Sequence, residues 1–347
     1  MKVLHLLATN SFSGAENVVC QIIKMFETDK NFEMFYCSPN GPINESLQSK
    51  GIKYLPIERL TTKAVKQIVK EIKPDIIHAH DVRASIIASK MDKHIEVISH
   101  IHGNHDKMRK ITAKSILYEA TVKRFKKIFW VSETALKDYR FHSKVKSKSE
   151  ILVNVINRDE IINQATQATN AEEADIVYLG RFSDEKNPKR VYDIMKNIIN
   201  KDKDIKGVFI GDGILKEDIQ QNIINDNMQN NIQIKGFLKN PMPILKNAKI
   251  LLMASKYEGT PMCVLEAMAL GIPIVSTPTD GVKSLIKNGV TGYLSNNDNE
   301  LVENGYGIIT NNEYRKKLSK NIIEEFNKRN NIEEYKEKLK SAYFERK

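Results

Sequence analysis

Two glutamates in one segment have the clearest capacity for chemistry. Glu258 and Glu266 are separated by seven residues in SKYEGTPMCVLEAMALGIP, residues 255–273. An apolar strand pattern ends before this segment and a helical pattern begins near Pro261 or Met262. We therefore expect Glu258 in the loop and Glu266 about one turn inside the helix, where both could accept hydrogen bonds from one hydroxyl-rich ligand. The alternative is that Glu258 only faces a helix N-terminus and Glu266 lies on a solvated face.

Two cations in a second loop suit a diphosphate. Arg181 and Lys186 lie in GRFSDEKNP, residues 180–188, directly after an expected strand. Arginine offers a planar fork of donors and lysine a point charge, the two common ways of holding phosphate oxygens. A surface loop with solvated charges remains the alternative.

Glycines follow three other expected strands. Gly14 precedes a helix in TNSFSGAE (9–16), Gly211 lies in a Gly-Asp-Gly turn, and Gly236 precedes Phe237. Small residues there let the backbone approach a ligand, and the N–H groups at a helix start favour an anion. Each segment could also be an ordinary turn.

Histidines are concentrated in one region of the first half, but their spacing lacks a metal signature. They are His78, His80, His94, His100, His102 and His105. No H-E-x-x-H motif and no neighbouring cysteine accompanies them, so we expect no bound metal. We expect His78 and His80 to be strand-end and loop residues.

Strands and helices must position these residues, and their alternating patterns occur in each of the two halves of the chain. In the first half, strands are expected at 2–7, 32–37, 53–55, 76–78, 96–99 and 128–131, with a helix at 15–26. In the second, strands are expected at 176–179, 207–210, 232–234, 250–253 and 273–276, and helices near 187–200, 214–226, 241–247 and 262–270. Residues 157–173 are polar, as in a linker, and residues 311–346 are charged and helical. The pattern predicts an α/β fold of two doubly wound parallel sheets with ligands at the carboxyl ends of the strands.

Composition excludes several classes of protein. The 347 residues suit two domains of about 150 residues each, and no apolar run approaches the roughly 18 residues of a membrane span. The start, MKVLHLLATN, is a poor signal peptide, and three cysteines without C-x-x-C spacing fit reduced thiols, so we expect a cytoplasmic protein. The net charge of +11 is uneven: residues 101–150 carry 13 basic and 5 acidic side chains. Such a surface favours an anionic partner, or serves general solubility.

Taken in order along nearly the whole chain, these segments resemble the retaining glycosyltransferases of family 4, of the bacterial polysaccharide-biosynthesis type. The family pattern is Glu-x7-Glu, here with EG-P before it and EAMA-G-P after it. Other matching segments are SGAE (13–16), DIIHAHDVRAS (75–85), HIHG (100–103), VSE (131–133), YLGRFSDEKN (178–187), GDG (211–213) and KGF (235–237). The chain departs from the family pattern at Ser13, at Thr279-Asp280-Gly281 and at Ser284.

The resemblance implies a GT-B fold, in which two Rossmann-like domains face a central cleft. It implies an acceptor-side domain at 1–160, a donor-binding domain at 161–310 and a tail at 311–347 that packs back toward the first domain. Arg181 and Lys186 would then hold the donor diphosphate, Glu266 the ribose and Glu258 the donor sugar, while His102 would reach that sugar from the first domain. The remaining donor-binding residues implied are Gly14, Gly211, Gly236, Phe237, Gly259, Thr260, Pro261, Met262 and Cys263.

The resemblance further implies transfer of a hexose or N-acetylhexosamine from a nucleoside diphosphate sugar, most simply a UDP-sugar, without metal or cofactor. The acceptor would be a polysaccharide or lipid-linked glycan, and the basic 101–150 region would rest on an anionic membrane. A sugar-nucleotide epimerase or hydrolase of the same fold remains an alternative. A nucleic-acid-binding protein is a more distant one, because no nucleic-acid-binding motif accompanies the positive charge.

Overall fold

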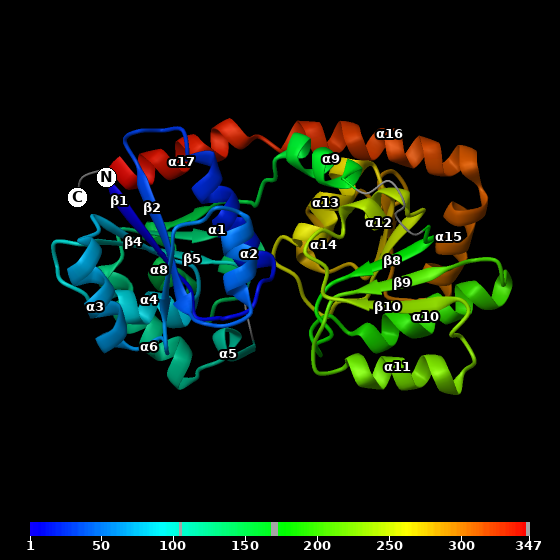
Figure 1. The fold of residues 1–347 in the computed structure, drawn as a ribbon, viewed down its shortest axis with the longest axis horizontal. Coiled ribbons are helices and arrows are strands. Elements are labelled where there is room, and N and C mark those ends of the chain that lie inside the picture. The colour runs from blue at the N-terminus through cyan, green and yellow to red at the C-terminus, as the bar shows by residue number, and fades with distance from the viewer. Residues whose placement is uncertain (104–105, 168–172, 345–347) are drawn as a thin grey trace. The chain divides into compact units, whose positions relative to one another are not determined.

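The computed structural model describes residues 1–103, 106–167 and 173–344, and it divides into two compact units. The first unit comprises Met1–Val155 with Ile332–Lys347, and the second comprises Ile156–Asn331. Each unit contains one parallel β-sheet with helices packed on it (Figure 1). The sequence prediction of two α/β domains, each with a parallel sheet, is therefore confirmed.

The first sheet has seven strands in the order β3-β2-β1-β4-β5-β6-β7, and all its pairs are parallel. Its strands are β1 (Lys2–Leu6), β2 (Glu33–Pro39), β3 (Tyr54–Ile57), β4 (Ile76–Ala79), β5 (Glu96–Ile101), β6 (Lys127–Trp130) and β7 (Ser149–Ile151). The helices of this unit are α1 (Gly14–Met25), α2 (Ile43–Ser49), α3 (Thr62–Ile72), α4 (Val82–Ala88), α5 (Asp106–Arg109), α6 (Ala113–Thr121), α7 (Glu133–Lys137), α8 (His142–Val145) and α17 (Ile332–Phe344).

The two faces of this sheet differ in chemistry. Alternate residues such as Leu4, Ile77 and Val97 join apolar side chains of α3, α4 and α6 in one large core. Because side chains alternate along a strand, the residues between them face the other way. On that second face five buried or partly buried histidines contact one another: His5 on β1, His78 and His80 at β4, and His100 and His102 at β5. We call these five residues the histidine cluster.

Helix α17 completes the first unit at the histidine cluster. Tyr343 is buried, and its hydroxyl lies 2.9 Å from Nδ1 of His78. Its ring contacts Phe26 and Phe32, and its carbonyl accepts a hydrogen bond from Nζ of Lys126. The last helix in the sequence is therefore part of the first unit's core (Figure 1).

Burial keeps the histidine cluster neutral. It lowers the pKa of His5 and His102 to about 3. Burial, and then repulsion from neighbouring histidines, holds the pKa of His78, His80 and His100 well below the ordinary value. The cause is that a charged imidazolium loses its hydration in the protein interior.

The second sheet has six parallel strands in the order β10-β9-β8-β11-β12-β13. Its strands are β8 (Ile176–Leu179), β9 (Gly207–Ile210), β10 (Ile232–Gly236), β11 (Ile250–Met253), β12 (Ile274–Ser276) and β13 (Gly292–Leu294). Its helices are α9 (Arg158–Thr166), α10 (Pro188–Lys201), α11 (Lys216–Asn225), α12 (Met242–Asn247), α13 (Met262–Leu270), α14 (Asp280–Lys283), α15 (Asp298–Thr310) and α16 (Asn312–Arg329).

The segment that we expected to be a linker, 157–173, is in part a helix. Residues 158–166 form α9, with Asn157 as its N-cap, and the helix packs on α12 and α13. Its apolar signal is weak because only Ile161 and Ala165 are buried. Residues 168–172 of the expected linker lie outside the described residues. The two strands absent from our prediction, β7 and β13, have three residues each, too few for a period-2 pattern to be recognised.

The boundaries between the units also differ from those expected. The first division falls after Val155 rather than after residue 160, so α9 belongs wholly to the second unit. The expected tail 311–347 is split, with α16 in the second unit and α17 in the first. Buried Leu318, Ile322 and Phe326 give α16 its own apolar face, and α16 contacts α13 and α15. No helix within the described ranges is both long and apolar enough to cross a bilayer.

The histidine cluster predicts that acid selectively destabilises the first unit. The unfolded chain binds a proton at each of these histidines near pH 6.5, whereas folded His5 and His102 do so only near pH 3. Stability is therefore lost as the pH falls from about 6.5 toward 3, at up to about 1.4 kcal/mol per pH unit for each histidine. Urea unfolding followed by fluorescence of Trp130, the single tryptophan, reports the first unit.

The second unit supplies an internal control, because all eight histidines precede residue 143. We expect replacement of buried His100 by leucine to reduce the pH dependence of the first unit, and replacement of exposed His94 by glutamine to leave it unchanged. Equal acid sensitivity of the two units above pH 5 would contradict this account.

Candidate functional site

The glutamate and phosphate-loop motifs meet at the centre of the second sheet. Strands β8 and β11 are neighbours, and the strand order reverses between them. In doubly wound sheets the loops on either side of such a reversal diverge, so a ligand can bind at the carboxyl ends of these two strands. Lys186 lies in the loop after β8, and Glu258 lies in the loop after β11.

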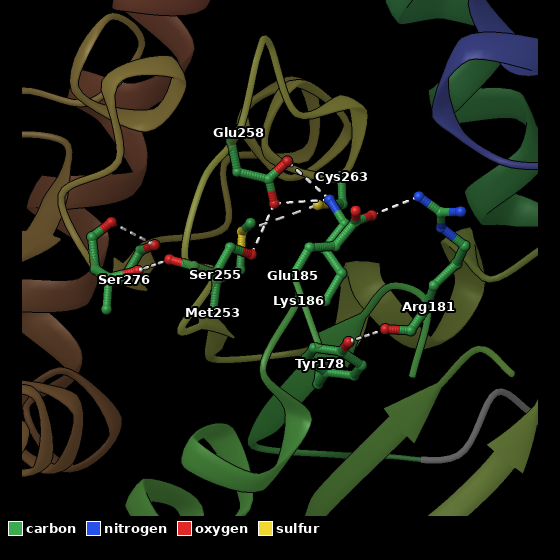
Figure 2. A network of polar contacts seen from close by, with 10 residues as sticks. Tyr178, Arg181, Glu185, Lys186, Met253, Ser255, Glu258, Cys263 and Ser276 are labelled. Atoms are coloured by element: carbon green, nitrogen blue, oxygen red, sulfur yellow. Dashed lines mark hydrogen bonds and ion pairs between the residues drawn. The ribbon is translucent and has the colours of Figure 1, made fainter. Parts of the chain in front are cut away.

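An ion pair joins these two loops. Nζ of Lys186 lies 2.7 Å from both carboxylate oxygens of Glu258 (Figure 2). Ser255 donates a third hydrogen bond to Glu258, also at 2.7 Å. The Glu258 side chain is only 6% exposed and that of Lys186 is 21% exposed. The two residues, which we expected to hold different parts of a ligand, therefore hold each other.

The pair keeps Lys186 charged. Burial alone would lower the pKa of Lys186, but the Glu258 carboxylate, together with Cys263 and Glu185, raises the pKa above its ordinary value. The site thus contains a cation whose charge is fixed at neutral pH, held by a carboxylate 72 residues away in the chain.

Arg181 is oriented from two directions. Its guanidinium donates to Glu185, four residues further along the same loop, and its carbonyl accepts from the Tyr178 hydroxyl at 2.6 Å (Figure 2). The Arg181 side chain is 51% exposed. Its guanidinium is therefore accessible, while its backbone is anchored. The carbonyl of Glu185 also accepts from the backbone N–H of Lys256, which joins the same two loops a second time.

Two glycines in the adjoining loops, Gly211 after β9 and Gly281 after β12, allow backbone to pack against backbone in this region. Gly211 has φ +140°, and a Cβ there would lie 1.9 Å from the carbonyl oxygen of Gly180. A Cβ on Gly281 would lie 2.0 Å from the carbonyl oxygen of Gly259, the residue after Glu258. Only glycine fits without displacing the neighbouring loop. The Thr-Asp-Gly segment, which departs from the common family pattern, thus still contains the glycine that this packing needs.

Helix α13 begins directly after the Glu258 loop. Thr260, Pro261 and Met262 are buried, and Gly259 is partly exposed. Glu266 is only 9% exposed, so it does not lie on a solvated helix face. Burial raises the pKa of Cys263 to about 12, and its sulfur lies 3.9 Å from that of Met253. A thiol in this state is a packing group and not a nucleophile.

Gly236 and Phe237, the remaining predicted site residues of the second unit, lie at the end of β10, which is two strands from β8 in the sheet. Gly236 ends β10 with φ +69°, and its carbonyl accepts from the N–H of Gly211. Phe237 follows with half its surface exposed. A half-exposed aromatic residue therefore follows the glycine whose carbonyl holds the Gly211 turn.

In the first unit, Gly14 is the first residue of α1 and is exposed. Its loop is held by Glu16, a residue that our sequence analysis did not single out. The buried Glu16 carboxylate accepts hydrogen bonds from Thr9 at 2.6 Å and from Ser13. The signal for this role was available, because Ser13 and Glu16 have the spacing of a capping box.

His102 follows β5 and is partly exposed. His78 and His80, which we expected in a strand end and a loop, are buried, and His80 is hydrogen-bonded to both His5 and His102. His94 is exposed and apart from this cluster, and His105 lies outside the described residues. Sequence reasoning missed His5, because it lies 73 residues from the nearest other histidine.

Two sets of three histidines place ring nitrogens within 4.8 Å of one another: His5, His78, His80 and His80, His100, His102. Each set contains two rings packed face to face, with centroids 4.1 Å and 4.2 Å apart and interplanar angles of 31° and 28°. Imidazole lone pairs lie in the ring plane, so stacked rings direct them side by side rather than toward one ion. This geometry does not favour a metal centre.

Two family models match the chain, one to each half. Glycosyltransferase Family 4 matches residues 12–160, and Glycosyl transferases group 1 matches residues 159–325. The UDP-Gal:α-D-GlcNAc-diphosphoundecaprenol α-1,3-galactosyltransferase of Escherichia coli is 22% identical over 99% of this chain and 97% of its own length. The lipopolysaccharide 1,6-galactosyltransferase of Salmonella typhimurium is 27% identical over 83% of each chain.

Among solved structures, Anabaena HepE in complex with UDP-glucose matches with a TM-score of 0.84 at 16% identity, covering 99% of both chains. At this identity the likeness concerns the fold, and it agrees with the two parallel sheets described above. Together the two family models and the architecture identify the chain as a glycosyltransferase with the GT-B fold.

Proposed function

We propose that this enzyme transfers a hexose or N-acetylhexosamine from a UDP-sugar to a lipid-linked or polysaccharide acceptor, with retention of the anomeric configuration. The observation that carries the proposal is the Lys186–Glu258 pair at the strand reversal of the second sheet. It places a permanent cation and a carboxylate within one ligand's reach. The names of the E. coli and Salmonella relatives and the UDP-glucose bound to the Anabaena protein support this class of donor and acceptor.

In this proposal Lys186 and Arg181 bind the donor diphosphate. Lys186 supplies a fixed charge and Arg181 an accessible planar fork. Both stabilise the negative charge that develops on the departing UDP, so we expect no metal or cofactor to be required. Glu266 accepts hydrogen bonds from the ribose hydroxyls, and Glu258 accepts them from the donor sugar.

The surrounding residues shape the rest of the donor site. The backbone of residues 259–263 contacts sugar and phosphate, and Gly211, Gly236 and the exposed ring of Phe237 accommodate the base. From the first unit we assign Gly14 to the approach of the phosphate and His102 to a sugar hydroxyl.

For the chemical step we propose attack on the face from which UDP leaves. The bond between the anomeric carbon and the UDP oxygen breaks, and the acceptor oxygen bonds to the same face. The acceptor proton passes to the departing phosphate oxygen. This route requires no protein nucleophile, and the raised pKa of the Cys263 thiol is consistent with that.

We further propose that α6 and its neighbours rest on an anionic membrane surface, as suits a cytoplasmic enzyme with a lipid-linked acceptor. Ile111, Ile116 and Leu117 are between 47% and 61% exposed. The cations Lys107, Lys110 and Lys114 lie within a few residues of them in the sequence. Apolar side chains among lysines are the composition of an interfacial binding surface. Residues 104–105 of the basic region lie outside the described residues.

Donor binding is tested by calorimetry with UDP, GDP, ADP and their sugars. We expect UDP and UDP-sugars to bind, and replacement of Lys186 or Glu266 by alanine to weaken binding at least about tenfold, because each removes a direct contact to the ligand. Removing metal ions with EDTA should leave the Kd for UDP and UDP-sugars unchanged. Lys189 is the matched control, because it is an exposed lysine at the start of α10 that pairs with Asp193.

Removing Lys186 alone leaves the Glu258 carboxylate buried without its cation, which can cost about 3–5 kcal/mol of stability. The double variant Lys186→Met, Glu258→Gln therefore separates folding from binding. A folded double variant that binds UDP as tightly as the parent would refute the assignment of the diphosphate site.

Stereochemistry and reaction class are tested by proton NMR of products from a UDP-α-sugar. With a polyprenyl diphosphate-linked N-acetylglucosamine acceptor we expect an α-linked disaccharide, and without acceptor we expect only slow release of sugar. A β-linked product would exclude same-face attack. Rapid acceptor-independent release of free sugar, or formation of an epimeric UDP-sugar, would favour a hydrolase or an epimerase.

Membrane association is tested by sedimentation with neutral and anionic vesicles. We expect stronger binding to anionic vesicles, lost in the double variant Ile116→Ser, Leu117→Ser because apolar contact and charge act together. Ile224→Ser, at an equally exposed isoleucine of the second unit, serves as the control. Equal sedimentation with both lipids would argue against an electrostatic contribution.

A further inference from the structure

Helix α6 is joined to the interior of the first unit by three buried hydroxyl groups. The hydroxyl of Tyr118 on α6 lies 2.8 Å from Oγ of Ser99 on β5. Oγ of Ser99 lies 2.8 Å from Oγ of Ser85 on α4, and Ser85 donates to the carbonyl of Asp81 at 2.7 Å. Tyr118, Ser99 and Ser85 are fully buried. We call these three residues the hydroxyl chain.

The hydroxyl chain has only one arrangement of protons. A carbonyl oxygen can only accept, so Ser85 uses its single proton on Asp81. Ser99 must then donate to Ser85, and Tyr118 must donate to Ser99. Every hydrogen bond therefore points the same way, from α6 through β5 and α4 to the residue that precedes α4.

The surroundings of the hydroxyl chain are apolar. Helix α6 packs on α4, and α4 packs on β5 (Figure 1). Ile87 of α4 and Val97 of β5 belong to the large core of the first unit, as does Tyr118. Apolar contacts alone have no preferred direction, and an apolar replacement of a buried hydrogen-bonded pair can be nearly neutral in stability. What the hydroxyls add is a single position for α6 relative to α4 and β5.

One end of the hydroxyl chain is an aspartate at the strand reversal of the first sheet. Asp81 follows β4, and the strand order reverses between β1 and β4. The Asp81 carboxylate accepts from the N–H of Ala8, in the loop after β1, and from the N–H of Ala84 on α4, each at 2.8 Å. Asp81 therefore ties together the two loops between which a doubly wound sheet binds its ligand.

The other end of the hydroxyl chain adjoins the apolar surface of α6. Ile116 and Leu117 directly precede Tyr118, and both are about half exposed. Successive residues of a helix point about 100° apart, so Leu117 and Tyr118 leave α6 in different directions. If α6 rests on a membrane as proposed above, one turn of this helix contacts lipid on one side and the hydroxyl chain on the other.

We propose that the hydroxyl chain holds the strand-end loops of the first unit in a fixed position relative to the membrane-facing side of α6, so that these loops receive a lipid-linked acceptor. The strand reversal of the second unit is assigned to the donor, which leaves the reversal of the first unit for the acceptor. Tyr118, Ser99 and Ser85 are then positioning residues that act through Asp81. The inference rests on the proposed function for the class of acceptor and for the membrane surface.

The inference is tested by transfer to two forms of one acceptor, with the UDP-sugar that the parent enzyme uses. One is polyprenyl diphosphate-linked N-acetylglucosamine in anionic vesicles, and the other has the same headgroup on a short, water-soluble alkyl chain. We expect Tyr118→Phe to raise the KM for the vesicle-borne acceptor about fivefold, the scale of one buried hydrogen bond, with kcat unchanged. The KM for the soluble acceptor and sedimentation with vesicles should match the parent, because the exposed side of α6 is unaltered.

Tyr139 provides a matched control on the same helix. It is a buried tyrosine whose hydroxyl donates to the carbonyl of Ser115 on α6 at 2.9 Å. Tyr139→Phe therefore removes one hydrogen bond to α6 without interrupting the hydroxyl chain, and it should leave both KM values unchanged. The double variant Tyr118→Phe, Ser99→Ala removes both partners of one hydrogen bond and leaves Ser85 donating to Asp81, so folding is preserved. It should raise the KM for the vesicle-borne acceptor as much as Tyr118→Phe alone.

The other outcomes distinguish positioning from packing. An unchanged KM for the vesicle-borne acceptor in Tyr118→Phe would overturn the inference. Equal increases in Tyr118→Phe and Tyr139→Phe, or equal increases for both acceptors, would also overturn it, because the hydroxyls would then only stabilise α6. Loss of vesicle sedimentation in Tyr118→Phe, or a parent chain that binds no vesicles, would exclude the link to the membrane. Failure of the parent chain to transfer sugar to either acceptor would instead refute the proposed function.

Discussion

The ion pair between Lys186 and Glu258 is the interaction on which the second unit's site depends. It connects loops that follow two neighbouring strands, and it is largely removed from solvent. A buried pair of this kind contributes little net stability, because the attraction is offset by the loss of hydration of both ions. Its consequence is geometric: the two strand-end loops are fixed relative to each other, and the glycine contacts at Gly211 and Gly281 bring the adjoining loops into direct backbone contact.

The first unit is organised by buried neutral side chains and not by an ion pair. Its sheet buries neutral imidazoles on one face and aliphatic side chains on the other. Of the ring nitrogens in the histidine cluster, five lack a partner in the described part of the chain. Buried polar atoms without partners cost stability. Helix α17 offsets part of this cost through Tyr343, which explains why the last helix joins the first unit.

Sequence reasoning located the elements better than the contacts among them. Strands β8, β9 and β11 lie where the apolar runs predict, because short apolar runs flanked by turn residues carry a clear signal. Helix α9 was missed because tertiary packing on α12 and α13, and not amphipathicity, stabilises it. The roles of Ser255 and Glu185 depend on side-chain contacts with Glu258 and Arg181 inside the same loops, and these contacts become apparent only in the folded chain. The carboxylate motif indicated a ligand site, but not that Glu258 already holds Lys186.

The pairing changes how the site's electrostatics are understood. From the sequence, Arg181 and Lys186 are two cations available to a diphosphate. In the structure Arg181 is paired with Glu185, and Lys186 with Glu258, so the local charge is close to balanced before any ligand arrives. If Arg181 and Lys186 bind the donor diphosphate as we propose, the diphosphate must compete with these carboxylates for the same donors. If sugar hydroxyls donate to Glu258, they replace part of what that carboxylate loses when Lys186 turns toward phosphate. Under the proposed assignment, nucleotide and sugar would therefore assist each other's binding through Glu258.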